Sequence, residues 1–298
     1  MRRHRKARLT AVACTCLALL GLSPATFAVE VYAAGDVAQC KGSVLNSGAA
    51  RTAKLIPDGA TVFVLGDSTY PQADTATIAA CYEPTWGRFR ANTLAVPGNH
   101  DYAKGSPHDF LEYFGARTPQ RTWFRAAVGD WWVIGLDSNL QGPALAQQQQ
   151  WLEGELRAIA GDGKCIVALW HHALFSSGLH KGDGTRMRAA WRALDAARAD
   201  LVLSGHEHFY ESFEPKNADG KQRPDGIREF VVGTGGAQLL DVSLSPRHRA
   251  YRRIHGVLEL DLEADRYSWR FKTVDGAVHD AGAATCRNSP RDLSPGSG

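Results

Sequence analysis

The stretch Leu201-Val202-Leu203-Ser204-Gly205-His206-Glu207-His208 joins an apolar run, typical of a buried strand, to two histidines. Two histidines separated by one residue point to the same side only where the backbone is extended or turned, so this stretch is not helical. In open α/β sheets, ligands collect at the carboxyl ends of the strands. Neutral imidazole is also the commonest protein ligand for transition metals. The stretch therefore indicates a metal site at a strand end.

Four other apolar runs also end in side chains that can bind metals. The residues that follow or close these runs are Asp36 after 31–35, Asp67 after 62–66, Asn99-His100-Asp101 after 94–98, and His171-His172 after 166–170. Solvated surface does not account for five strand ends that all carry oxygen or nitrogen ligands. We therefore predict that they form one shared site.

The order of the predicted elements indicates the fold class. The 298 residues can fill one α/β domain, and 44% apolar with 22% charged residues is an ordinary balance for a soluble globular protein. Predicted helices cover 73–82, 109–114, 147–160 and 185–199, and predicted strands include 30–35, 122–127, 131–137, 165–171, 229–232, 256–262 and 267–273. Strands that alternate with helices and then give way to an antiparallel end predict an α/β fold with two packed mixed β-sheets flanked by helices.

The first 28 residues have the pattern of a cleaved signal peptide. A basic segment ending at Arg8 precedes the uncharged run 9–22, and Thr26-Phe27-Ala28 offers a cleavage site. The run is too short for a stable membrane span; Cys14 and Cys16 leave a lipoprotein anchor as the alternative. Removing this segment takes away five basic residues and leaves 29 basic against 31 acidic ones, so the formal charge changes from +3 to −2. Bulk charge therefore gives no reason to expect nucleic-acid binding.

The mature chain keeps four cysteines, an even number that favours two disulfides in an exported protein. Cys40 and Cys81 both lie early, whereas Cys165 starts a strand and Cys286 lies near the end of the chain. We prefer the pairs 40–81 and 165–286, although the sequence alone allows three pairings.

Taken together, the motifs resemble those of the calcineurin-like metallophosphoesterase superfamily. They are Asp36, Gly66-Asp67-Ser68-Thr69-Tyr70, Gly98-Asn99-His100-Asp101, Trp170-His171-His172 and Gly205-His206-Glu207-His208. Many members have a histidine where this chain has Ala38. Tyr70, three residues after the second aspartate, resembles the tyrosinate ligand of the purple acid phosphatase branch. Ala173, where members often have proline, departs from the family pattern without touching ligand chemistry.

The resemblance implies two metal ions and assigns their ligands. The first ion would be bound by Asp36, Tyr70 and His208, the second by Asn99, His171 and His206. Asp67 would bridge the two ions, one carboxylate oxygen to each. A phenolate is a hard anionic donor that favours trivalent iron, whereas amide and imidazole suit a divalent ion. We therefore expect iron paired with zinc, manganese or a second iron.

Further residues receive roles from the same resemblance. His100 would contact the phosphate or the leaving group, and Asp101 would hold the ring of His100 in orientation. His180, nine residues after His171, matches the offset of a phosphate-contacting histidine, although an exposed loop imidazole is the alternative. His172 is expected to support the ligands or to pack, because adjacent residues on a strand face opposite sides. The glycine-rich loop 233–236 could pass close to the site.

The predicted function is that of a phosphatase, secreted or periplasmic, which hydrolyses phosphate monoesters by attack of a metal-activated water. A phosphodiesterase or nucleotide hydrolase with the same site is the first alternative, and a secreted metal-binding protein without turnover is the second. The expected partner is a small phosphate ester, and the oligomeric state stays open. The predicted domain covers 29–286, followed by a disordered tail at 287–298 rich in Ser, Pro and Gly.

Overall fold

The computed structural model describes residues 28–115, 121–180, 182–241 and 249–288. The predicted signal segment lies outside these ranges except for Ala28, as does the predicted tail from residue 289. Arg287, the first residue of that tail, is buried, and its backbone N–H donates to Asp200 at 2.6 Å. Within the described ranges, no helix has the length and apolarity needed to cross a membrane.

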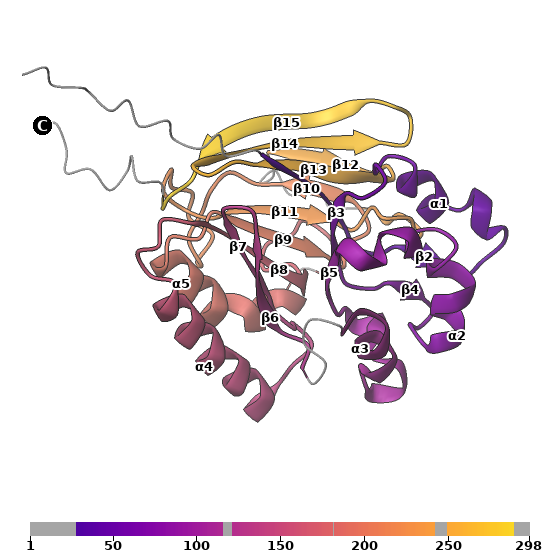
Figure 1. The fold of residues 1–298 in the computed structure, drawn as a ribbon, viewed down its shortest axis with the longest axis horizontal. Helices are drawn as coiled ribbons and strands as arrows, with labels where there is room; N and C mark the ends of the chain where they lie inside the picture. The colour runs from indigo at the N-terminus through magenta and orange to yellow at the C-terminus, as the bar shows by residue number, and fades with distance from the viewer. Residues whose placement is uncertain (1–27, 116–120, 181, 242–248, 289–298) are drawn as a thin grey trace, which may run out of the picture.

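Two large sheets form the centre of the molecule (Figure 1). The first has the strand order β15 (Val278–Thr285), β14 (Arg266–Thr273), β13 (Gly256–Leu262), β1 (Val29–Ala34), β3 (Thr61–Leu65), β5 (Thr93–Val96). The second has the order β12 (Ala250–Arg252), β10 (Tyr210–Ser212), β11 (Arg228–Val232), β9 (Leu201–Gly205), β8 (Cys165–His172), β7 (Trp131–Gly135), β6 (Phe124–Val128). Each sheet contains parallel and antiparallel pairs, which confirms the predicted mixed sheets.

The hydrophobic core has two layers. Successive side chains of β8 point alternately into one layer and the other. Val167 and Leu169 belong to the cluster between the two sheets, whereas Ala168 and Trp170 belong to the cluster beneath the helices. A strand buried on both faces reads as a continuous apolar run, as this one does. Helices α4 (Gly142–Ala158) and α5 (Arg188–Ala196) lie on the outer side of the second sheet (Figure 1).

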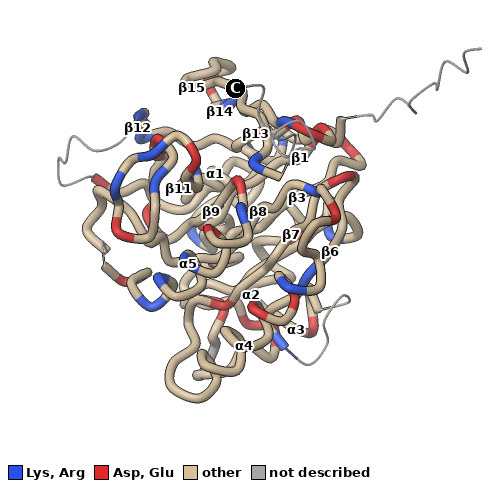
Figure 2. The backbone as a smooth tube through the Cα atoms, turned by 90° about the vertical axis from the view of Figure 1, so that its left-hand side faces the viewer, with Lys and Arg blue, Asp and Glu red and all other residues tan. Residues whose placement is uncertain are grey.

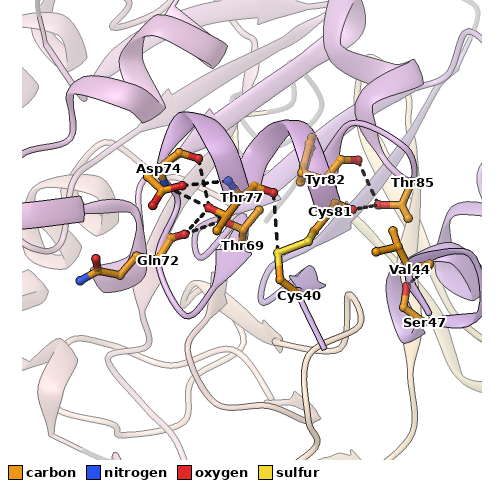
Figure 3. Close-up of a disulfide and its surroundings, with 10 residues drawn as sticks. All are labelled: Cys40, Val44, Ser47, Thr69, Gln72, Asp74, Thr77, Cys81, Tyr82 and Thr85. Carbon is orange, nitrogen blue, oxygen red and sulfur yellow. Dashed lines mark hydrogen bonds between the residues drawn. A yellow bond between two sulfur atoms is a disulfide. The ribbon is translucent and has the colours of Figure 1, made fainter. Parts of the chain in front are cut away.

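The remaining elements lie on the opposite side of Figure 1 and carry one of the predicted ligands. They are α1 (Gly48–Ala53), α2 (Thr75–Thr77), α3 (His108–Phe114) and a small parallel pair formed by β2 (Ala38–Gln39) and β4 (Thr69–Tyr70). A disulfide between Cys40 and Cys81 joins the end of β2 to the helical turn Ile78–Tyr82 (Figure 3). A second one joins Cys165 to Cys286. Both preferred pairings are confirmed.

Several predicted boundaries are wrong for identifiable reasons. The helix predicted from residue 147 begins at Gly142, because Pro143 fits the first helical turn instead of preventing it. The helix predicted over 73–82 is a short α-helix, capped by Asp74, that continues as a π-helical turn. Strand β15 was not predicted because it is rich in small residues. Its Gly282 is required by packing, since a Cβ there would lie 2.3 Å from the ring of Trp269.

Acidic and basic residues are interspersed along the backbone on the face shown in Figure 2.

Candidate metal centre

The structure brings all seven predicted metal ligands together at one edge of the two sheets. They follow or close strands β1, β3 and β5 of the first sheet and β8 and β9 of the second, with one ligand from β4: Asp36, Asp67, Asn99, His171, His206, His208 and Tyr70. The carboxyl ends of parallel strands meet at the same edge of a sheet. Residues spread along much of the chain therefore become neighbours.

The first group of donors consists of Asp36, Tyr70 and His208. The phenolic oxygen of Tyr70 lies 2.6 Å from Asp36 Oδ1 and 2.9 Å from His208 Nε2. His208 Nε2 in turn lies 3.1 Å from Asp36 Oδ1. The three donor atoms thus converge on one point, as the predicted first metal shell requires.

The second group consists of Asn99, His171 and His206. His171 Nε2 lies 3.2 Å from Asn99 Oδ1 and 3.2 Å from His206 Nδ1. These atoms are the donors that the resemblance assigned to the second ion. Amide oxygen with two imidazoles is a donor set suited to a divalent transition metal.

Asp67 joins the two groups through a single oxygen. Its Oδ2 lies 2.8 Å from the phenolic oxygen of Tyr70 and 3.3 Å from His171 Nε2. Its Oδ1 accepts a hydrogen bond of 2.8 Å from the backbone N–H of His100. Oδ2 is thus the oxygen that faces both donor groups, whereas Oδ1 faces the backbone at His100; the bridging of two ions by Asp67 stays a prediction.

The hydrogen bonds around the imidazoles leave lone pairs that point inward. Nδ1 of His171 contacts the Leu65 carbonyl at 2.8 Å, and Nδ1 of His208 contacts the Gln238 carbonyl at 2.6 Å. A carbonyl accepts only, so each Nδ1 carries the proton and each Nε2 presents a lone pair. Tyr70 has one phenolic proton for three close acceptors. The converging lone pairs fit bound cations, which the residues present here could hold.

The pKa values of the buried groups also indicate a cation site. Burial alone would raise the pKa of Asp67, but the charges of His171 and His100 outweigh it, so the pKa is lowered. Burial likewise lowers the pKa of His171, but Asp67 and Asp36 raise it to about 9. The pKa of Tyr70 lies well above its usual range, because it is buried beside Asp36 and Asp67. Without an ion, the buried carboxylates therefore hold protons on the nearby imidazoles; a bound cation would displace those protons and take the Nε2 lone pairs.

The backbone at the ligands is unusual and depends on glycine. Asp36, Asp67 and His206 have φ values of 58°, 52° and 71°, a left-handed conformation that costs non-glycine residues about 1–3 kcal/mol each. A Cβ on Gly66 would lie 2.4 Å from Nδ1 of His171, and one on Gly98 would lie 2.1 Å from Oδ1 of Asp67. Gly66 therefore allows the second sheet to approach the first, and Gly98 leaves room for the carboxylate of Asp67.

His100 lies beside the first donor group, but Asp101 does not contact its ring. Nδ1 of His100 contacts the Pro71 carbonyl at 2.6 Å, and its Nε2 lies 4.0 Å from Asp67 Oδ2. The predicted orientation of His100 by Asp101 is wrong. Asp101 is fully buried and accepts backbone N–H groups of Asp67 at 2.7 Å, Ser68 at 3.0 Å and Gly98 at 2.7 Å. It holds the loops that carry Asp67 and Asn99 together.

His180 and His172 border the second donor group. The ring centroid of His180 lies 4.7 Å from that of His206, and the centroid of His172 lies 4.3 Å from it. His172 Nδ1 contacts Ser138 Oγ at 2.8 Å, and burial with the charges of His171 and His206 lowers its pKa to about 2. His172 thus packs against a ligand, as predicted.

Sequence reasoning missed two acids that touch the site. Asp183 Oδ2 lies 3.1 Å from Nε2 of His206, the nitrogen that faces away from the second donor group. Glu207 is 1% exposed and contacts His180. Neither residue has a spacing that distinguishes it from other loop acids. The loop 233–236 does pass close to the site, since a Cβ on Gly233 would lie 2.7 Å from Asp36 Oδ2.

Residues 32–210 match the sequence profile described as calcineurin-like phosphoesterase. The chain belongs to this family. It is 27% identical over 239 residues to purple acid phosphatase 22 of Arabidopsis thaliana, and the match covers 72% of this chain and 51% of that protein. It is also 27% identical over 167 residues to the uncharacterized protein Rv2577 of Mycobacterium tuberculosis, covering 48% of this chain and 30% of that protein. The chain thus spans about half or less of the length of these relatives.

Solved structures share this fold at low sequence identity. The purple acid phosphatase PPD1 from yellow lupin seeds has a TM-score of 0.69 at 18% identity, covering 91% of this chain and 56% of that one. GAP50 of Plasmodium has a TM-score of 0.72 at 14% identity, and the match covers 89% of this chain and 90% of that one. These likenesses confirm the predicted fold class. The plant relative and the lupin structure also support the predicted purple acid phosphatase-like branch.

Proposed function

We propose that this calcineurin-like phosphoesterase is a dinuclear-metal phosphatase that hydrolyses phosphate monoesters. The observation that carries the proposal is the position of Asp67 Oδ2 between two complete donor groups. A shared anionic oxygen is what two neighbouring cations need. When bound, the ions would supply Lewis-acid activation of water and neutralise charge on the phosphoryl oxygens.

The donor types favour different ions in the two groups. The phenolate and carboxylate of the first group are hard anionic donors that suit ferric iron, and the amide and imidazoles of the second suit zinc, manganese or ferrous iron. Burial beside Asp36 and Asp67 raises the pKa of Tyr70, so a cation bound by these residues would have to displace the phenolic proton.

His100 and His180 are proposed to bind the phosphate and to protonate the leaving oxygen. Both side chains border the donor groups and remain partly exposed, 36% for His100 and 41% for His180, so a substrate can reach them. Protonated imidazoles would favour a dianionic monoester over a diester, which carries one charge less. Asp101 would act through the loops it fastens rather than on the substrate.

We further propose that the protein works outside the cytoplasm. The basic and apolar character of 1–28 and the two disulfides support export, because disulfides persist in oxidising compartments. The mature chain would then begin near Val29.

The reaction class is tested by comparing kcat/KM for nitrophenyl phosphate and bis-nitrophenyl phosphate across pH. Wild type should prefer the monoester, and His100→Ala should reduce monoester turnover. His108→Ala is the matched control, because His108 is an exposed histidine on α3. A diester preference at every pH, or unchanged monoester turnover in His100→Ala, overturns the proposal.

A further inference from the structure

We propose that Glu207 is a positioning residue that holds His180 in its place over the second donor group. The inference rests on the proposed function, in which His180 contacts the phosphate. Glu207 lies between the ligands His206 and His208, so a carboxylate on the ligand-bearing turn would set the position of a residue on a different loop.

Glu207 contacts His180 at two points. Its Oε1 accepts a hydrogen bond of 2.9 Å from the backbone N–H of His180, and its Oε2 lies 3.4 Å from Nδ1 of the His180 ring. With Nδ1 turned towards this carboxylate, Nε2 is left for a ligand. The glutamate side chain is 2% exposed, whereas that of His180 is 41% exposed. A rigid, buried group therefore orients an accessible one.

The loop leading to His180 has room for Glu207 only because residue 178 is glycine. A Cβ on Gly178 would lie 2.0 Å from Oε2 of Glu207. Gly178 does not have a positive φ, so this requirement comes from the carboxylate and not from the backbone conformation. The position of the Glu207 carboxylate thus requires glycine at residue 178.

Two other buried acids accept backbone N–H groups of the same loop at residues that precede His180. Glu229 accepts the backbone N–H groups of Leu174 at 3.1 Å and Phe175 at 3.2 Å. Glu211 accepts the backbone N–H of Ser177 at 3.0 Å. The three carboxylates thus fix the loop from its start to His180, and Glu207 also contacts the imidazole ring. This difference provides an internal control.

A double-mutant cycle separates positioning from general support of the loop. The variants are Glu207→Gln, His180→Ala and their combination, with Glu211→Gln and its combination with His180→Ala as controls. The measured quantities are kcat/KM for nitrophenyl phosphate and the Kd of inorganic phosphate for the metal-loaded protein. We expect His180→Ala to weaken both about 10- to 100-fold, as for loss of a hydrogen bond to a charged group.

If Glu207 acts through His180, Glu207→Gln should weaken both quantities about tenfold alone and should have no further effect in the His180→Ala background. Glu211→Gln should have the same effect in both backgrounds. An equal loss from Glu207→Gln with and without His180 would overturn the proposal. Gly178→Ala, which displaces Glu207 without removing its charge, should reproduce the loss and tests the same point if Glu207→Gln folds poorly.

Hydrogen exchange of the metal-free protein gives a readout that does not depend on turnover. The amide of His180 should exchange faster in Glu207→Ala, which removes the acceptor, than in wild type, and unchanged exchange would contradict the contact. Failure of the proposed function would appear differently, as a wild-type protein that neither binds metal nor hydrolyses phosphate esters.

Discussion

Replacing Asp183 should weaken one of the two metal sites and spare the other. Its carboxylate lies 3.1 Å from Nε2 of His206, whose Nδ1 faces the second donor group. A carboxylate there fixes the proton on Nε2 and leaves the Nδ1 lone pair for the ion. In Asp183→Ala the imidazole can rotate or carry its proton on Nδ1, which competes with metal binding.

The exposure of Asp183 sets the size of this effect. Loss of a residue that orients a metal-binding histidine typically costs about 10- to 100-fold in metal affinity. Asp183 is 51% exposed, so water can replace part of its interaction. We therefore expect the lower end of this range, a loss of metal affinity of about tenfold, which corresponds to about 1.4 kcal/mol.

The assay is a competition titration of the metal-free protein with zinc and a chromophoric chelator, which resolves two affinities. The affinity assigned to Asn99, His171 and His206 should fall, and the other should not change. Asp219→Ala is the matched control, because Asp219 is 67% exposed and pairs with Arg188 and Arg192 on α5. Two unchanged affinities, or an equal loss in the control, would refute the reasoning.

Three further predictions follow from other parts of the molecule. The oxidised, iron-loaded protein should show a visible charge-transfer band that Tyr70→Phe abolishes; a colourless iron-loaded wild type argues against a phenolate ligand. Burial raises the pKa of Glu229 to about 8, against the opposing charge of Lys216. Its contribution to stability is therefore complete below about pH 4.5 and is lost as the pH rises towards 8. The unfolding free energy of the metal-free wild type relative to Glu229→Gln should fall between pH 5 and 8, by up to about 1.4 kcal/mol per pH unit; a difference that is constant with pH is the contrary result. The native protein should have no alkylatable thiols, and reduction should lower its unfolding free energy by about 4 kcal/mol for the 40–81 link and about 5 kcal/mol for the 165–286 link. Four reactive cysteines in the native protein would contradict the pairing.

The sequence predicts which side chains lie together because most of them come shortly after an apolar strand, although Tyr70 lies on the short strand β4. A run such as Val62-Phe63-Val64-Leu65 that stops abruptly at Asp67 is visible without any tertiary information. Parallel strands then bring these ends together, so order along the chain is enough to predict one site.

The parts that the sequence does not predict depend on contacts between distant loops. Asp183 and Glu207 reach their histidines only after the loop beyond β8 folds against the turn beyond β9. The orientation of the Asp67 carboxylate is held by the backbone N–H of His100, which donates to Oδ1, and no residue pattern encodes this contact. Asp101 is the chain neighbour of His100, yet its buried carboxylate fastens backbone amides from two loops.

The most direct test of the central claim is the metal content of Asp67→Asn. Purified wild type and variant would be loaded with metal, desalted and measured by elemental analysis, with nitrophenyl phosphate turnover measured on the same samples. Because a neutral amide oxygen cannot hold two cations together, wild type should retain about two ions per chain and the variant fewer, with most activity lost. An Asp67→Asn protein that keeps two ions and near-normal turnover would contradict the account.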